Sequence, residues 1–161
     1  MLEKLDPQKA SLAILAIAMA TIAGAWIFQF AGYDPCPLCL QQRWAYYFAV
    51  PFSLLLSVSA GNNPKGGRRG LYLLALVMLG SAIFGAYHAG VEWQWWPGPE
   101  TCSGDISGGL PDLSKPAVAC NEAALRIFGI SLAGWNAIIS VVLAAIALAG
   151  ARHHGSSSVS Q

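Results

Sequence analysis

The chain has 161 residues, of which 55% are hydrophobic and only 11% are charged, and its formal net charge is +1 at pH 7. The charged fraction is about half that of a typical soluble domain, which excludes an ordinary water-soluble protein and indicates a membrane protein.

Four stretches are apolar enough to cross a membrane. A spanning helix needs about 20 mostly apolar residues to cover a hydrocarbon core about 30 Å thick. Such stretches occupy residues 10–30, 43–60, 71–89 and 127–150. We predict helices, because open strands would leave their backbone groups unpaired in lipid. The predicted fold class is therefore all-α, a single four-helix membrane domain over residues 1–161.

Local features refine the first three spans. The first is too long for the apolar region of a signal peptide. The second contains Pro51, and its serines can hydrogen-bond to helix carbonyls. Small residues recur every four positions in the first and third spans, which is typical of helix-packing faces. These residues are Ala16, Ala20 and Gly24, then Ser81, Gly85 and Ala89.

The distribution of lysine and arginine predicts the orientation. With four spans, both termini share a side with residues 61–70. That side carries six of the nine basic residues, so the positive-inside rule predicts cytoplasmic termini in a bacterial inner membrane, with residues 151–161 as a flexible tail. Residues 31–42 and 90–126 become periplasmic loops. The second begins with Trp93, Trp95 and Trp96, which we interpret as part of an interfacial aromatic belt.

All four cysteines fall in these two outer loops. Cys36 and Cys39 form a CPLC motif, and Cys102 and Cys120 lie in the second loop. The outer side of a bacterial membrane is oxidising, which favours disulfides. A four-cysteine zinc site normally shows two CxxC knuckles, and covalent haem attachment needs CxxCH, whereas residue 40 is leucine. We therefore expect no metal site.

The CPLC pair has the features of a redox centre. A bridge between Cys36 and Cys39 closes only four residues and would stabilise little, and such pairs are usually redox-active. We expect the second helix to begin near Leu40, so that its positive end favours a thiolate. Arg43 follows Cys39 by one helical turn, and we expect its guanidinium to point back at that sulfur.

The ring sizes predict the direction of electron flow. In the chain-entropy model, closing the Cys36–Cys39 ring stabilises the folded protein by ~1.9 kcal/mol, and closing the Cys102–Cys120 ring stabilises it by ~3.2 kcal/mol. The difference makes the CPLC bridge the stronger oxidant by ~30 mV, so electrons should run toward it. The sequence has no GxGxxG motif and no room for a flavin domain in its outer loops. A lipid-soluble quinone fits an acceptor at the membrane edge.

The residues CPLCLQQR resemble the CxLCxxxR signature of the bacterial disulfide bond formation protein B (DsbB) family, which are quinone-dependent thiol oxidases of the inner membrane. The stretch YHAGVEWQWWPGPETCSG is similar to the family's segment between the third helix and the first loop cysteine. Pro37 is compatible with this pattern, although it removes one amide donor near the sulfurs. The resemblance covers nearly the whole chain.

The resemblance implies a thiol relay. A reduced periplasmic thioredoxin-fold partner, similar to disulfide bond protein A, would attack Cys102, after which Cys120 would attack Cys36 and release Cys39 toward ubiquinone or menaquinone. Such a relay sustains disulfide bond formation in secreted proteins and involves no nucleic acid. It also implies that Arg43 assists the thiolate and the quinone. His88 and Glu92, one turn apart at the outer end of the third span, would border the quinone pocket.

Two other functions compete with this enzyme. A membrane scaffold could use the same disulfides only to staple its loops, without redox turnover. An outward-directed reductase would need redox cysteines within the spans or on both sides of the membrane, and this chain has neither.

Overall fold

The computed structural model describes residues 5–99, residue 102 and residues 120–152. Four helices form the bundle: α1 (Pro7–Phe30), α2 (Pro37–Ser59), α3 (Pro64–Glu92) and α4 (Leu132–Arg152). A short hairpin of β1 (Arg126–Ile127) and β2 (Ile130–Ser131) precedes α4. Most of the predicted second outer loop and the tail beyond Arg152 lie outside the described residues.

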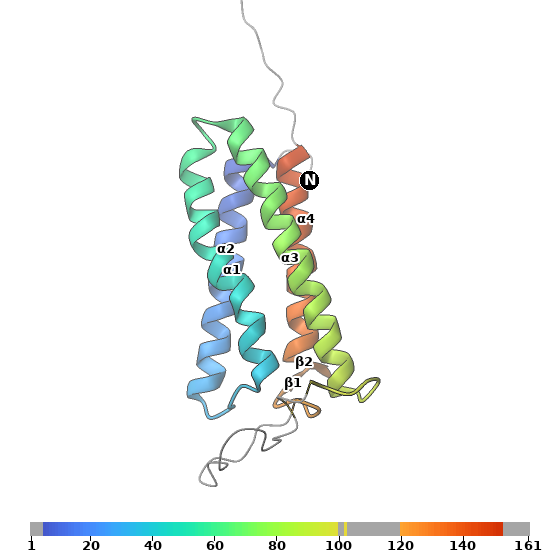
Figure 1. Cartoon of the computed structure of the whole chain (residues 1–161). Coiled ribbons are helices and arrows are strands. Elements are labelled where there is room, and N and C mark those ends of the chain that lie inside the picture. The colour runs from blue at the N-terminus through green and yellow to red at the C-terminus, as the bar shows by residue number, and fades with distance from the viewer. Residues whose placement is uncertain (1–4, 100–101, 103–119, 153–161) are drawn as a thin grey trace, which may run out of the picture.

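The helices alternate in direction and lie side by side (Figure 1). The start of α1, the α2–α3 turn and the end of α4 lie together at one end of the bundle, and the α1–α2 connection and the hairpin lie at the other. This agrees with the prediction that both termini share a side with residues 61–70. The basic residues Lys9, Lys65, Arg68, Arg69 and Arg152 belong to the first of these ends.

Three helices begin in the same way. Each of α1, α2 and α3 has proline in its first turn, where a missing N–H costs no hydrogen bond. The preceding residue caps the helix by accepting a hydrogen bond from the amide three residues on. The caps are Asp6 at 2.8 Å, Cys36 at 3.2 Å and Asn63 at 2.9 Å.

This cap corrects the predicted start of α2. The helix begins at Pro37 rather than near Leu40, because the Cys36 sulfur provides the acceptor that its first turn needs. Cys39 therefore lies within the first helical turn, and Cys36 lies just outside it. Pro37 removes no hydrogen bond at this position.

The hairpin corrects the predicted start of the fourth span. Residues 127–131 are not helical, because Phe128 and Gly129 have φ angles of 52° and 81° and reverse the chain in a two-residue turn. The indole of Trp135 donates a hydrogen bond to the Ile127 carbonyl at 3.0 Å, which ties the hairpin to α4. The helix begins only at Leu132.

Three helices of the described chain, α1, α3 and α4, are long and apolar enough to cross a membrane. The helical membrane protein predicted from the sequence is therefore confirmed in class. A crossing by α2 stays a prediction. This prediction is supported by the apolar face that α2 exposes on the outside of the bundle, where Trp44 and Val58 are 74% and 72% exposed.

Polar side chains join the helices inside the bundle. The hydroxyls of Tyr46 on α2 and Ser140 on α4 lie 3.1 Å apart, and Ser140 donates to Ser81 on α3 at 3.0 Å. In α2, Ser53 donates to the Val50 carbonyl at 3.1 Å, as predicted for the serines of that span. Apolar surface outside and satisfied polar groups inside are the arrangement that a lipid environment favours.

The predicted packing of small residues is confirmed for α3 and wrong for much of α1. A Cβ on Gly85 would lie 2.9 Å from the Asn136 amide nitrogen and 3.0 Å from the Ala137 backbone nitrogen, so α3 and α4 need glycine there. Ala16 and Ala20 are exposed instead. Ala20 and Gly24 border a cavity, because small side chains leave space beside α1.

We predict that Gly85→Ala lowers the stability of the protein. The added methyl must displace α4, and such overpacking costs about 1–3 kcal/mol. Gly80→Ala is the matched control, because it lies on the same helix with nothing within 4 Å of the added Cβ, and alanine favours helix by up to about 1 kcal/mol. Thermal unfolding in detergent, followed by circular dichroism, compares the two. A Gly85→Ala variant as stable as Gly80→Ala would contradict this packing.

Candidate functional site

The four cysteines meet at the end of the bundle that carries the hairpin. Cys102 and Cys120 are disulfide-bonded, whereas Cys36 and Cys39 are free, with their sulfurs 2.7 Å apart. Cys36 and Cys120 belong to one buried apolar cluster with Leu38, and Cys39 and Cys102 pack against it. The fold therefore brings the two cysteine pairs, which are far apart in the sequence, into one site.

His88 joins this site from α3. Its ring is 1% exposed, and its Nε2 lies 3.5 Å from the Cys36 sulfur. The other ring nitrogen, Nδ1, lies 2.7 Å from the Gln42 amide nitrogen. Glu92, one turn further along α3, places Oε1 3.9 Å from His88 Nε2. A buried chain of polar groups thus runs from Glu92 through His88 to Cys36.

Gln42 was not among the predicted site residues. The signal for it was an amide one turn after Cys39 at the start of an otherwise apolar span, where a polar group needs a partner. The partner, His88, is 46 residues away, so spacing along the chain could not identify it.

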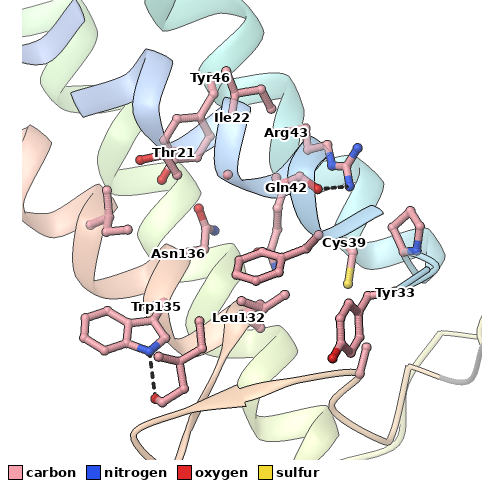
Figure 2. A pocket seen from close by; sticks show the side chains of 18 of the residues that line it. Thr21, Ile22, Tyr33, Cys39, Gln42, Arg43, Tyr46, Leu132, Trp135 and Asn136 are labelled. Carbon is pink, nitrogen blue, oxygen red and sulfur yellow. Dashed lines mark hydrogen bonds between the residues drawn. The ribbon is translucent and has the colours of Figure 1, made fainter. Parts of the chain in front are cut away.

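Arg43 does not point at Cys39 in the structure. Its guanidinium donates to the Gln29 side-chain oxygen at 2.6 Å and to the Ala25 carbonyl at 3.5 Å, both on α1. The expected orientation toward the sulfur is therefore wrong. Figure 2 shows Arg43 and Cys39 on successive turns of α2, with the guanidinium hydrogen-bonded away from the sulfur.

Arg43 and Cys39 nevertheless line the same cavity, of about 460 Å³, within the range of small-molecule sites (Figure 2). Its walls come from α1, α2, α4 and the hairpin. Apolar side chains dominate them, including Ile22, Phe28, Leu132, Trp135 and Ile139.

The polar groups of this cavity are few. Besides Arg43 and Cys39 they include Asn136, whose buried Nδ2 has no hydrogen-bond partner among the described residues. His88 and Glu92 are not among the residues that line this cavity, and their role near a quinone stays a prediction. They contact the other side of the dithiol, at Cys36.

The two thiols differ in acidity. The hydrogen bond shared with Cys39 lowers the pKa of Cys36 to about 5, helped by His88 and by the Cys39 amide and opposed by burial. The same hydrogen bond, together with burial, raises the pKa of Cys39. Cys36 is therefore the more acidic thiol of the pair.

A second hollow, of about 510 Å³, lies beside the disulfide. Trp95, Trp96, Gly98 and Asn121 line it with Cys102. Cys102 is half-buried there, whereas Cys120 is fully buried. Among the described residues, Cys102 is therefore the more exposed sulfur of the disulfide.

Known proteins are similar to this chain over most of its length. The family model described as disulfide bond formation protein DsbB matches residues 7–150. The chain is 32% identical over 140 residues to disulfide bond formation protein B of Albidiferax ferrireducens, covering 78% of this chain and 76% of that protein. It is 32% identical over 156 residues to the protein of the same name from Burkholderia pseudomallei, covering 89% and 90%. No solved structure matches the chain.

The matched range contains both cysteine pairs, Arg43, His88 and Glu92. The resemblance carried by the CPLCLQQR motif is thereby confirmed, and the chain belongs to the disulfide bond formation protein B family.

Proposed function

We propose that this protein oxidises a periplasmic thioredoxin-fold dithiol partner and passes the two electrons to a membrane quinone. Membership of its family assigns the chain to disulfide bond formation. The observation that carries the finer proposal is the placement of the CPLC dithiol. Cys36 belongs to the same buried cluster as Cys120, and Cys39 lines an apolar cavity.

The cavity fits a quinone. Its apolar walls suit a ring and the start of an isoprenoid tail, and its volume matches a small-molecule site. The unpartnered Nδ2 of Asn136 is a hydrogen-bond donor, which is the group that a quinone carbonyl requires. Arg43 offers further N–H groups on the same wall. When bound, a quinone accepts two electrons and two protons.

The relay begins at Cys102. A thiolate of the partner attacks the half-buried Cys102 sulfur, the Cys102–Cys120 bond breaks, and Cys120 leaves as a thiolate. The hollow at Trp95 and Trp96 gives the partner a surface beside the reacting sulfur. The partner's second thiol then attacks this mixed disulfide, which releases the partner oxidised and Cys102 reduced.

Cys120 passes the electrons inward. When Cys36 and Cys39 are bridged, the freed Cys120 thiolate attacks Cys36, its neighbour in the buried cluster, and Cys39 leaves as a thiolate. The balance is one partner dithiol oxidised and two electrons delivered to Cys39. The reduced Cys102 then attacks Cys120, the Cys120–Cys36 bond breaks, and the loop disulfide re-forms with Cys36 and Cys39 left as the dithiol. Loss of two electrons and two protons to the acceptor re-forms the Cys36–Cys39 bond.

The acidity of the two thiols supports this order. The hydrogen bond from Cys36 is the main cause that raises the pKa of Cys39. Once Cys36 is bonded to Cys120, it can no longer hold the negative charge, so this cause disappears. The charge then moves to Cys39, the sulfur that lines the cavity. His88, 3.5 Å from Cys36, is placed to exchange a proton with that sulfur.

The distribution of basic residues supports a proposed orientation of the bundle in the membrane. The basic residues gather at the end of the bundle opposite the cysteines, so the positive-inside rule favours a periplasmic site in a bacterial inner membrane. A disulfide-stapled scaffold would need neither an unbonded dithiol against a buried histidine nor a cavity at its edge. These two features favour the enzyme.

We expect Cys39→Ser to abolish catalytic oxidation of the partner, because no sulfur then faces the cavity. The variant keeps Cys102 and Cys120, so it should still oxidise one equivalent of partner, which serves as an internal control for folding. Partner oxidation in membranes with added quinone is measured by alkylation and gel shift. Full multiple turnover by Cys39→Ser would refute the assignment.

A Cys120→Ser variant, with Cys102 first bridged to an added small thiol, should accumulate a mixed disulfide with a partner whose second active-site cysteine is replaced by serine. Neither Cys120 nor the partner's second thiol is then present to break the mixed disulfide, so the adduct persists and is visible on a non-reducing gel. Cys102→Ser is the control and should trap no partner. An absence of adduct in both variants would favour the scaffold.

Asn136→Ala should raise the KM for quinone by about tenfold, because one hydrogen bond of about 1–1.5 kcal/mol is lost. The kcat at saturating quinone should change little. Asn62→Ala, an exposed asparagine at the opposite end of the bundle, is the matched control. Quinone reduction followed by ultraviolet absorbance gives both constants. An unchanged KM would place the quinone elsewhere.

A further inference from the structure

Cys36, Cys39 and His88 place their ligand atoms within 4.8 Å of one another, although they come from two helices. We propose that the dithiol form of this cluster binds a thiophilic divalent cation such as Zn²⁺ or Cd²⁺, with Glu92 as the fourth ligand. The sequence predicts no metal site, because the spacing of the four cysteines does not match that of a four-cysteine zinc site. The histidine that completes the set lies 52 residues beyond Cys36.

The geometry suits tetrahedral coordination. Zinc binds sulfur at ~2.3 Å and imidazole nitrogen at ~2.0–2.1 Å, which places a sulfur and a nitrogen ligand about 3.5 Å apart. The distance between the Cys36 sulfur and His88 Nε2 is 3.5 Å. The two sulfurs, 2.7 Å apart, would have to separate to about 3.8 Å around an ion. Cys39 can make this movement because it lies at the edge of the cavity.

Glu92 supplies the observation that points to a cation. Its side chain is 5% exposed, Oε1 lies 3.9 Å from His88 Nε2, and Oε2 has no hydrogen-bond partner among the described residues. A buried carboxylate oxygen without a partner is rare and costly. A cation held by His88 and the two sulfurs would bind this oxygen once the carboxylate turns, because Oε1 rather than Oε2 now lies toward His88 Nε2.

Gln42 can orient the histidine. Metal-bound histidine almost always donates its other ring N–H to an oxygen. The Gln42 side chain lies 2.7 Å from Nδ1, and its amide nitrogen and oxygen are exchanged by a simple flip. With the oxygen toward Nδ1, the lone pair of Nε2 is free to face the ion.

Binding would depend on the redox state. The dithiol loses two protons and gains one M²⁺, and no electron moves, whereas the Cys36–Cys39 disulfide has no thiolate to offer. The cation therefore competes with oxidation of the dithiol. Because the metal binds only the reduced form, each tenfold excess of free metal over its dissociation constant raises the reduction potential of the pair by about 30 mV. Such an ion would hold the protein reduced and stop electron flow.

The test uses the full chain without an affinity tag, in detergent, in a Cys102→Ser/Cys120→Ser background so that only the CPLC thiols remain. Cd²⁺ is titrated into the reduced protein and followed by thiolate-to-metal ultraviolet absorbance. We expect one ion per chain and none in the oxidised protein. His88→Gln should weaken binding at least about tenfold. His153→Gln, in the C-terminal tail, is the matched control and should not change it.

Equal Cd²⁺ affinity in His88→Gln and its parent would overturn the proposal, as would equal binding by the oxidised protein. If His88→Gln fails to fold, X-ray absorption of the Zn²⁺-loaded parent decides. Two sulfurs at ~2.3 Å with nitrogen or oxygen at ~2.0–2.1 Å support the site, and a shell without sulfur refutes it. Neither measurement uses a quinone or a partner, so failure here leaves the proposed oxidase intact.

Discussion

The contact of His88 with Cys36 and Gln42 joins the end of α3 to the start of α2. Apolar packing alone discriminates poorly between helix registers in lipid, where the surroundings are as apolar as the helix faces. A buried polar group that loses its partner costs about 1–3 kcal/mol, so these side chains must stay together. The position of the CPLC motif at the end of the bundle depends on this contact, and so does the place of Cys36 in the buried cluster that also contains Cys120.

The contact with His88 also gives the two sulfurs of the dithiol different surroundings. Cys36 faces the protein interior, where the histidine and the buried loop cysteine lie, and Cys39 faces the cavity. In the proposed relay, exchange with a protein thiol and delivery of electrons to a lipid-soluble acceptor would therefore take place on opposite sides of one motif. Cys36 is the cap residue of α2 and Cys39 lies in its first turn, so the two side chains leave the backbone in different directions. The two sulfurs can therefore serve different reaction partners.

The buried polar groups on the inner side also connect the two proposals. Glu92 and His88 lie against Cys36 and away from the cavity, so they can serve a proton or a cation at the dithiol without contacting a quinone. Oxidation removes both thiolates, and metal binding requires both. The Cys36 and Cys39 sulfurs of the reduced protein can therefore either form a disulfide or bind a cation, but not both at once.

The sequence by itself determined the helical membrane class and placed a CxxC motif at the start of a helix, because hydropathy and helix boundaries depend on near neighbours. It favoured disulfides for both cysteine pairs, and only the tertiary structure distinguished the bridged Cys102 and Cys120 from the free Cys36 and Cys39. Only the tertiary structure decided that Arg43 bonds to α1 and that His88 faces Cys36. The four-residue spacing correctly put Arg43 one turn from Cys39, but a long side chain takes the best acceptor within reach, and that acceptor is Gln29. Which residues of different helices meet depends on their packing register, and no local pattern in one chain encodes it.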